Sequence, residues 1–312
     1  PVSYKGLTYG LPESEEFQMM FYRKDILQSA KINAQPPQDW TEVKVLIREL
    51  QKNNLTFGLG NMVAFSNTGM GMASGFVPYL TFLFQNGGKL YYNDGERSAL
   101  TDKVALEQFK EYTSYYTQWK LLYAYNFPTM FSSGEMPVGI ALYSIYNQLL
   151  MYAPEISSLW DMVPVPGIRK PDGSIDRSSP SIVYGALMLR QSKNKDKAWE
   201  FLKWWTEAET IVNYSRELES LIGPVGRMLT ANKEALEKLP WSADVLNKLK
   251  SQQSWLVGVP EVPGSYNTQR YVDFAYRDVI IHGIDPAEAF PDYVRRIDEE
   301  LARKQEEFFG KK

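Results

Sequence analysis

The amino-acid sequence predicts an α/β protein that divides into two lobes. Two segments, 17–22 and 136–142, are short and almost continuously apolar, which is typical of strands buried on both faces. Other segments, such as 105–119, are longer and carry apolar residues at helical spacing. With 312 residues, the chain can bury a large core, and two lobes are expected rather than one.

The composition is ordinary for a globular protein and argues against some kinds of partner. Hydrophobic residues make up 44% and charged residues 23% of the chain. The formal net charge of −3 gives no electrostatic reason to expect a nucleic acid or an anionic membrane as a partner. No apolar run approaches the roughly 18 residues that a bilayer-spanning helix needs.

Aromatic residues are abundant, with 8 Trp, 20 Tyr and 15 Phe. Most of these rings are expected in a large core, because aromatic side chains bury much area. Tyr and Trp also suit sugars, since a ring face stacks on pyranose C–H groups while the hydroxyl or indole N–H remains free to hydrogen-bond. The absence of cysteine excludes thiol nucleophiles, Cys-ligated zinc and disulfide bonds.

The rest of the chain is organised around segment 6–42. Residues 7–11 are mostly apolar or aromatic, 17–22 are apolar apart from one Gln, and a proline and several acids lie between them. We expect two buried strands joined by a polar elbow. A ligand can bind at such an elbow.

A helix start follows this elbow region. Asp39 and Glu42 have the spacing of a capping box, in which each side chain accepts from a backbone N–H of the first turn. The apolar face behind the box is Val43, Leu46, Ile47 and Leu50. A shorter helix is expected before it, from residue 23 to the region before Pro36.

Three parts of this segment carry a family resemblance: Tyr-Gly-Leu-Pro at 9–12, Tyr-Arg-Lys-Asp at 22–25 and Pro-Pro-x-x-Trp-x-Glu at 36–42. Together they resemble the first inter-lobe crossover of extracellular solute-binding proteins of the carbohydrate-uptake type, the class that includes maltose-binding protein. The resemblance continues in order over nearly the whole chain. It implies a type II periplasmic-binding-protein-like fold, in which crossover strands join two α/β lobes.

The resemblance also implies how the chain divides. Residues 1–11 would form a crossover strand, 12–166 and 226–312 the C-terminal lobe, and 167–225 a remnant of the N-terminal lobe. In the family pattern about a hundred residues, roughly one small domain, would precede Pro1, so we expect the first lobe to be incomplete. The remnant would then expose apolar surface, unless another chain, a swapped copy or further residues cover it.

A glycine-rich loop and a buried helix come next. Residues 57–65 indicate a strand with loops, 78–85 a buried helix, and the glycine pair 87–88 its end. In the resembling family the loop before such a helix faces the ligand cleft, so Asn67 and Met70 are candidate binding residues. Loop flexibility alone explains the glycines equally well.

The strongest local site signal after the elbow lies in 126–148. The segment predicts a small helix, a Ser-Gly-Glu turn at 133–135, the buried strand 136–142 and a further helix. Ligands bind beyond the carboxyl ends of strands in open α/β sheets, and a helix start adds free N–H groups. The residues that follow the strand are therefore candidates: Tyr143, Ser144, Tyr146 and Asn147.

Two further crossovers are implied by the resemblance. The apolar run 178–190 would be the second crossover, although an ordinary sheet strand explains it equally well. A helix that begins at 193–197 would bury a face made of Ala198, Phe201, Leu202 and Trp205. The third crossover would lie near 223–227.

The last candidate site lies where a loop enters a helix. The prolines and glycine of 260–264 predict an extended loop, and the helix behind it packs through Val272, Ala275, Tyr276 and Val279. In the family this junction lines the cleft, so Tyr266, Gln269 and Arg270 are candidate binding residues, although the family's usual stacking aromatic is not found at Arg270. A long helix from Asp285 follows, with an apolar face of Phe290, Val294, Ile297, Leu301 and Phe308.

Glu13 and Glu16 are the candidate carboxylates. The resemblance places Glu16 where a cleft carboxylate accepts hydrogen bonds from sugar hydroxyls, and Glu13 on the elbow itself. Solvated loop acids are an equally good explanation for each. Paired carboxylates also serve glycosidases, but that chemistry requires two carboxyl groups several ångströms apart across the scissile bond, which a sequence cannot show.

Other chemistry has little support in the sequence. His282 is the single histidine and lies at a predicted helix end, where a cation is structurally useful. One histidine and no cysteine leave no transition-metal constellation. The GxGxxG and GxxxxGKS/T phosphate motifs and the EF-hand calcium pattern are absent, and we expect no cofactor.

The resemblance implies a protein that binds a carbohydrate, specifically an oligosaccharide, without altering it and delivers it to the permease of an ABC transporter. It would act at the extracellular face of the cell membrane or in the periplasm, with a lipid anchor or as part of a longer exported chain. Lacking most of one lobe, this chain alone would bind weakly or not at all. The alternatives are a glycoside-active enzyme that uses Glu13 or Glu16, and a protein-interaction module that uses an exposed sheet edge.

Overall fold

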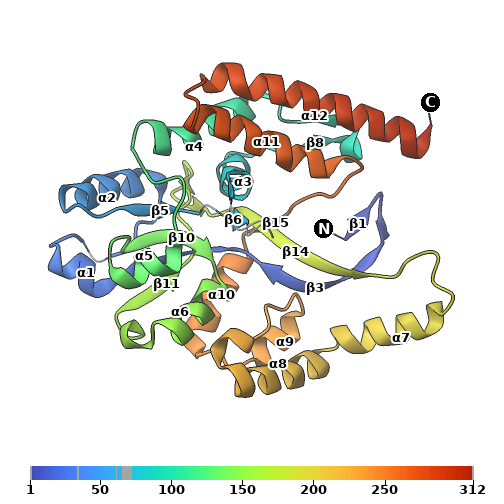
Figure 1. The fold of residues 1–312 in the computed structure, drawn as a ribbon, viewed down its shortest axis with the longest axis horizontal. Coiled ribbons are helices and arrows are strands. Elements are labelled where there is room, and N and C mark those ends of the chain that lie inside the picture. Colours follow the sequence, from blue (N-terminus) through green and yellow to red (C-terminus); the bar gives the residue numbers. More distant parts are fainter. Residues whose placement is uncertain (1, 34, 61, 65–71, 311–312) are drawn as a thin grey trace.

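The computed structural model describes residues 2–33, 35–60, 62–64 and 72–310 (Figure 1). The α-helices are α1 (Lys24–Ser29), α2 (Trp40–Lys52), α3 (Phe76–Gln85), α4 (Lys103–Thr117), α5 (Phe127–Ser133), α6 (Ile145–Tyr152), α7 (Lys195–Thr206), α8 (Ala208–Ile222), α9 (Lys233–Lys238), α10 (Ala243–Gln253), α11 (Ser265–Ile280) and α12 (Pro286–Phe309). None of them, within the described ranges, is both long and apolar enough to cross a membrane.

Among the residues that the structure describes, the strands form two main sheets and four small hairpins. The main sheets contain β3 (Gly10–Glu16), β4 (Gln18–Arg23), β5 (Phe57–Leu59), β10 (Val138–Leu142), β11 (Trp160–Val163), β14 (Ser179–Leu187) and β15 (Leu256–Gly258). The hairpins pair β1 (Ser3–Tyr4) with β2 (Leu7–Thr8), β6 (Met62–Ala64) with β7 (Met72–Ser74), β8 (Tyr91–Tyr92) with β9 (Arg97–Ser98), and β12 (Ile168–Arg169) with β13 (Ile175–Asp176).

The four-stranded sheet has the order β11-β4-β10-β5 and is covered on both faces. Along β4, Met20 and Tyr22 belong to the larger core with α2, α3, α4, α11 and α12, whereas Met19 and Phe21 belong to a second core with α5, α6 and α10. Side chains alternate between the faces of a strand, so both faces of β4 need apolar residues. This is why its run of apolar residues is nearly continuous.

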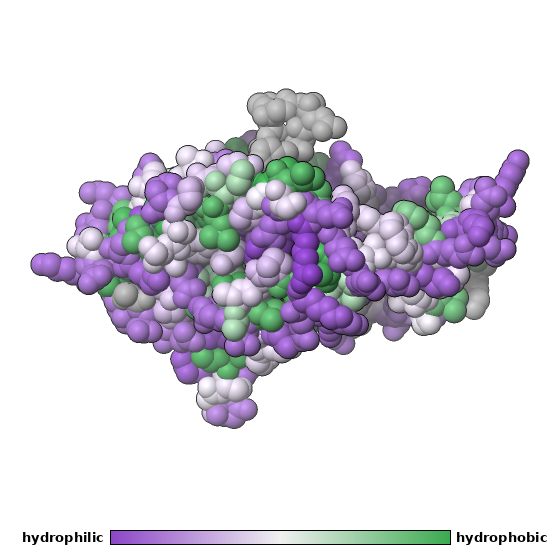
Figure 2. All heavy atoms as spheres, turned by 90° about the horizontal axis from the view of Figure 1, so that it is seen from below, coloured by the Kyte–Doolittle hydropathy of each residue, from purple (hydrophilic) through white to green (hydrophobic). Residues whose placement is uncertain are grey.

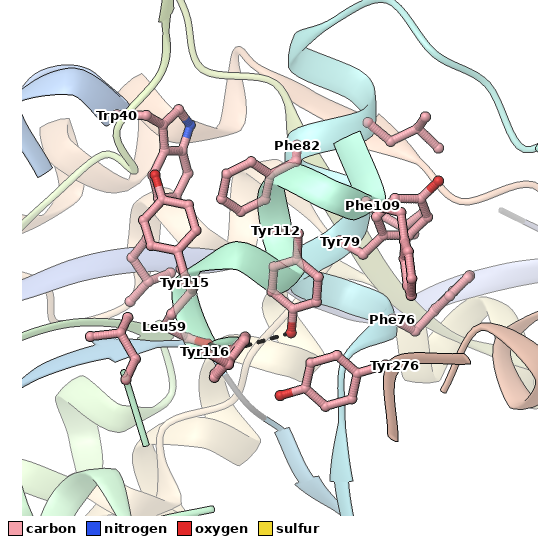
Figure 3. Packing of buried hydrophobic residues seen from close by; sticks show 14 of the residues in the cluster. Trp40, Leu59, Phe76, Tyr79, Phe82, Phe109, Tyr112, Tyr115, Tyr116 and Tyr276 are labelled. Carbon is pink, nitrogen blue, oxygen red and sulfur yellow. Dashed lines mark hydrogen bonds between the residues drawn. The ribbon is translucent and has the colours of Figure 1, made fainter. Parts of the chain in front are cut away.

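The larger core is built around α3, whose 10 residues are all buried. Rings from α3, α4 and α11 pack against one another there (Figure 3). Tyr112 stacks on Tyr276 with ring centroids 5.4 Å apart, and the Tyr116 hydroxyl donates to the Leu59 carbonyl at 3.0 Å. These contacts tie α4 to both α11 and the sheet.

The second sheet, of order β15-β14-β3, corrects the expectation for the N-terminal segment. The acids of 13–16 lie within β3, which pairs antiparallel with β14, and the polar elbow is absent; the break between strands falls at Phe17. Residues 7–11 are not buried, and Leu7 is 61% exposed. A strand accommodates the acids because its partners supply hydrogen bonds to them.

Strands β3 and β14 extend from the main body toward α7 and α8 (Figure 1). Only the first three residues of β14 are buried, and α7 buries none of its described residues fully. The predicted buried face of α7 is therefore wrong: Phe201 is 55% exposed, while Ala198, Leu202 and Trp205 are half-buried.

The exposed apolar surface expected for this region is present. Its large side chains include Tyr184, Leu187, Leu189, Phe201 and Trp204, each more than a third exposed. Seen from below, the molecule shows apolar residues reaching the surface in patches among hydrophilic ones, including the end where α7 lies (Figure 2).

Several other elements begin and end close to their predicted positions. In the capping box of α2, Asp39 accepts from the N–H groups of Thr41 and Glu42, both at 3.0 Å. Glu42 accepts from the N–H of Gln38 at 2.7 Å rather than from Asp39. The four predicted packing residues of α11 are buried, whereas Phe308 of α12, predicted to be apolar core, is 61% exposed.

Candidate functional site

A groove of about 600 Å³ opens beside β14. Its volume lies within the usual range of small-molecule sites, roughly 300–1,000 Å³. Its walls come from the β1–β2 hairpin, the start of α3, β8, the length of β14, and the loop that leads into α11. The lining residues are Val2, Ser3, Tyr4, Tyr9, Phe76, Val77, Leu80, Tyr91, Ser181, Ile182, Val183, Tyr184, Gly185, Leu187, Val259, Pro260, Glu261, Ser265, Tyr266 and Gln269.

Tyrosine is the commonest residue type in this groove. The five tyrosines are Tyr4, Tyr9, Tyr91, Tyr184 and Tyr266. Tyr184 and Tyr266 are 59% and 76% exposed, so their ring faces are available for stacking. Burial raises the pKa of Tyr91 above its usual value, which keeps this phenol neutral and able to donate a hydrogen bond.

A few polar groups accompany the rings. Glu261 accepts from the Ser265 hydroxyl at 2.5 Å, and Gln269 is exposed one turn further along α11. A carboxylate and an amide can accept from ligand hydroxyls, and the amide can also donate. An apolar groove with few polar groups of this kind is typical of ligand sites.

Local backbone features aim these side chains into the groove. Gly264 precedes α11 with a φ of 97°, a left-handed conformation that favours glycine, and it turns the extended loop into the helix that carries Tyr266. In β14, a register shift between Tyr184 and Gly185 interrupts the pairing with β3. Irregularities of this kind re-aim side chains at sheet edges and binding sites.

A second cluster of predicted site residues lies at the start of α6. Glu16 is half-buried beside Ser144. Burial raises the pKa of its carboxyl above the usual value, and hydrogen bonds from the Ser144 side chain and backbone oppose this rise. Within the part of the chain that the structure describes, Glu16 Oε1 is buried and has no hydrogen-bond partner, so its capacity to accept a hydrogen bond is unused.

The neighbouring candidates on α6 and before it are more enclosed. Tyr143 is 1% exposed, stacks on Phe17 at 4.6 Å and donates its hydroxyl to the Glu15 carbonyl at 3.1 Å. Asn147 is 3% exposed, and its Oδ1 has no partner among the described residues. Tyr146 is half-buried between the rings of Trp160 and Trp241.

The remaining candidates are placed differently. The structure brings Tyr266 and Gln269 together in the tyrosine-lined groove, whereas Glu16, Ser144, Tyr143, Tyr146 and Asn147 do not line it. Arg270 is exposed, with its guanidinium 5.4 Å from the Phe274 ring centre. Asn67 and Met70 lie outside the described residues.

The acids of β3 each bond to a different segment. Glu13 accepts from the indole N–H of Trp205 on α7 at 2.8 Å. Glu15 accepts from the Ser181 hydroxyl at 2.6 Å, and Glu16 contacts Ser144. Glu13 and Glu16 therefore bond to different partners, on α7 and at the start of α6.

Apart from Tyr266 and Gln269, the groove residues were not predicted as site residues from the sequence; among them are Tyr9, Tyr91, Tyr184 and Glu261. Tyr9 and Tyr184 could have been identified from the sequence, since each is an aromatic residue within a predicted crossover strand. Tyr91 and Glu261 could not, because their place in the groove depends on distant chain segments. Among the described residues, no group of three or more His, Cys, Asp or Glu side chains is arranged to hold a metal ion.

Comparison with known proteins gives a family match and distant relatives. Residues 1–211 match the family described as bacterial extracellular solute-binding protein. A putative binding protein of Brucella abortus is 28% identical over 218 residues, 65% of this chain and 47% of the relative. The maltotriose-binding protein of Pyrococcus abyssi is 25% identical over 226 residues, 68% of this chain and 43% of the relative. The chain thus spans about half the length of the curated relatives it matches.

Solved structures show the same fold at low identity. The sugar-binding protein MalE of Xanthomonas citri has a TM-score of 0.75 at 18% identity, over 100% of this chain and 75% of that protein. An ABC-transporter solute-binding protein of Thermotoga lettingae, bound with α-D-tagatose, has a TM-score of 0.74 at 19% identity, over 96% and 74%. The GacH receptor of Streptomyces glaucescens, solved with acarbose, has 0.73 at 16% identity, over 96% and 73%. These likenesses confirm the predicted α/β fold of the type II periplasmic-binding-protein class.

Proposed function

Because the chain belongs to the family of bacterial extracellular solute-binding proteins, we propose that it binds a carbohydrate and delivers it to the permease of an ABC transporter. The observation that carries the choice of ligand is the groove lined by five tyrosines and a few polar groups. Aromatic faces and hydroxyl-bonding side chains are the groups that a pyranose ring requires.

We propose an oligosaccharide rather than a single hexose as the ligand. The exposed rings of Tyr184 and Tyr266 belong to separate elements, β14 and α11, so one ring can stack on each of two sugar units. The names of several similar proteins point the same way, since they mention maltose, maltotriose, maltotetraose or acarbose.

Binding needs no chemical change in the sugar. The tyrosine rings would stack on pyranose faces, and Glu261 and Gln269 would bond hydroxyls from α11 and the loop before it. We propose a second set of contacts from Glu16, Ser144, Tyr146 and Asn147, with Tyr143 behind them, and from Arg270, Asn67 and Met70. A ligand that contacts residues on both sides of β14 would bind the closed arrangement of the two lobes more tightly than the open one. Ligand binding would therefore favour the closed arrangement.

We also propose the division of the chain into a crossover strand (1–11), a C-terminal lobe (12–166 with 226–312) and a smaller unit (167–225). The exposed apolar residues of β14 and α7 support the view that the smaller unit packs incompletely in this chain. The affinity of this chain alone for a sugar would therefore be weak.

The protein would be located on the extracellular side of the membrane or in the periplasm, with a lipid anchor or within a longer exported chain. Nothing in the comparisons supports a swapped second chain.

Ligand-observed NMR tests this proposal, because saturation transfer detects weak, millimolar binding. Maltose, maltotriose and maltotetraose should each be tested against the 312-residue chain, and we expect transfer to at least one. Tyr266→Ala should weaken that binding about tenfold, equivalent to about 1.4 kcal/mol. Tyr152→Ala is the matched control, because Tyr152 is 73% exposed but does not line the groove. Absence of transfer to every sugar, or equal effects of the two substitutions, would contradict the proposal.

A further inference from the structure

Two walls of the groove are helix starts that are distant in the sequence. Phe76, Val77 and Leu80 come from the beginning of α3, and Ser265, Tyr266 and Gln269 from the beginning of α11. A ligand that touches both walls is held well only if their separation is fixed. The contacts between α3 and α11 therefore bear on binding.

A single buried carboxylate joins the two helices. Asp273 lies on α11, two turns after Tyr266, and is 8% exposed. Its Oδ1 accepts from the N–H of Gly75 at 2.8 Å and of Phe76 at 3.0 Å. The Ser74 hydroxyl lies 3.0 Å from each carboxylate oxygen.

This carboxylate takes the place of a local helix cap. The residue at the cap position of α3 is Gly75, which has no side chain to accept from the first N–H groups. A helix start leaves those N–H groups without partners inside the helix and favours a negative charge nearby. Asp273 supplies both the acceptor and the charge from a helix that lies 198 residues away along the chain.

A second contact at the same point shows how closely the two helices approach. A Cβ built on Gly75 would lie 2.5 Å from Cγ of Tyr276, a ring atom, so only glycine fits against that ring. Tyr276 is held in turn by stacking on Tyr112 at 5.4 Å and by edge contact with Tyr116 at 5.4 Å (Figure 3). The start of α3 is thus fixed against α11 by hydrogen bonds on one side and by ring packing on the other.

We propose that Asp273 is a positioning residue of the groove: its carboxylate fixes the start of α3 against α11 and so sets the distance between two ligand-binding walls. It does not touch the ligand itself, since it is not among the residues that line the groove. The inference deepens the proposed function and rests on it for the part that concerns affinity.

Amide hydrogen exchange tests the positioning without any ligand. In Asp273→Ala, the amides of Gly75 and Phe76 should exchange about tenfold faster, which is the size of effect expected when a helix cap is removed. Asp273→Asn keeps an oxygen that can accept from both amides, so it should restore most of the protection and fold even if the alanine variant does not. Asp278→Ala is the control, because Asp278 lies on the same helix but accepts from Tyr293 at 2.8 Å.

Unchanged exchange of both amides in Asp273→Ala, or equal acceleration in Asp278→Ala, overturns the proposal.

A second measurement concerns ligand binding and uses maltotriose as the probe. Asp273→Ala should weaken its binding at least fivefold, Asp273→Asn should restore it, and the Asp278 control should leave it unchanged. If the natural sequence binds no maltotriose, the proposed function fails for this sugar while the exchange experiment still decides the positioning. Equal maltotriose binding by the alanine variant and the natural sequence, with faster exchange at Gly75, would also overturn the role in the groove.

Discussion

At the scale of single residues, surroundings rather than residue type decide what a carboxylate does in this protein. Glu13 and Glu15 hold neighbouring segments through hydrogen bonds, and Glu16 keeps one buried oxygen without a partner among the described residues. Asp273 is more deeply buried and joins two helices. The sequence presents all of them only as acids, and their partners come from chain segments far away.

Asp273 should make stability depend on pH. Burial raises its pKa from 3.8 to about 6, against the opposing effects of the hydrogen bonds from Ser74, Gly75 and Phe76 and of the Arg277 charge. Because the folded-state pKa exceeds the unfolded one, the part of the stabilisation that depends on protonation of Asp273 is complete below about pH 4 and is lost as the pH rises through 6, while the carboxylate still accepts from Gly75 and Phe76. The loss amounts to at most about 3 kcal/mol.

Urea unfolding of the natural sequence and of Asp273→Asn, at several pH values between 4 and 8, measures this effect. The free energy of unfolding of the natural sequence should fall relative to that of the variant as the pH rises from 5 to 7. The other groups near Asp273 should not obscure this change. Tyr112, on α4, stays neutral because burial raises its pKa. A difference between the two proteins that does not vary with pH would show that Asp273 does not titrate in this range.

At the scale of elements, local signals predicted the helices well, and tertiary contacts decided how they are buried. Helix α2 follows from the Asp39 cap and an apolar face, both of which are present, although Glu42 accepts from the Gln38 N–H rather than from the Asp39 N–H. Helix α7 also forms where its apolar spacing predicts, yet none of its described residues is fully buried. Spacing indicates which side of a helix is apolar, but whether that side is covered depends on other segments.

The cap of α2 gives a prediction at this scale. Asp39→Ala removes the acceptor for two N–H groups and a salt bridge to Arg169 of 2.9 Å, and should cost about 1–2 kcal/mol of unfolding free energy. Asp39→Asn keeps an acceptor for the N–H groups and loses mainly the ion pair. Because Arg169 is 51% exposed, that loss should be at most about 0.5 kcal/mol. Equal losses in thermal unfolding of the two variants would contradict the capping role.

At the scale of the whole molecule, the chain combines a well-packed body with an exposed extension. The body contains two aromatic-rich cores on either face of one sheet. The extension, formed by the end of β14 and by α7, leaves large apolar side chains in solvent. Exposed apolar patches of this kind mark surfaces that another part of a protein covers, or sites of association.

Replacement of these side chains should therefore change association and not stability. The double variant Leu187→Ser, Phe201→Ser should bind less of the dye ANS and self-associate less, with an unfolding free energy changed by less than about 1 kcal/mol. The control is Phe290→Ser, because Phe290 is 1% exposed and its loss should cost about 3–5 kcal/mol. A large loss of stability in the double variant, measured by urea unfolding, would show that the extension is packed.

The candidate site was only partly predictable. Tyr266 and Gln269 were identified from a loop-into-helix junction and do line the groove. Glu16 and Ser144 were each named as candidates for separate reasons, and their contact is seen only in the structure. Tyr143 was a candidate because it follows a strand, but its side chain turns inward onto Phe17. Sequence spacing locates the end of a strand; it does not say which face the next side chain takes.

The sequence by itself determined the α/β class and most helix and strand positions, because these follow from short-range patterns of apolar residues, caps and turn residues. The family was indicated separately, by the resemblance of several short motifs to those of solute-binding proteins. Only the tertiary structure decided that the acids of 13–16 lie in a strand, that α7 remains exposed, and that Asp273 caps a helix 198 residues away. Each of these depends on contacts between segments that are distant in the sequence. Burial and hydrogen bonding arise from those contacts, and the local pattern of residues along the chain does not specify them.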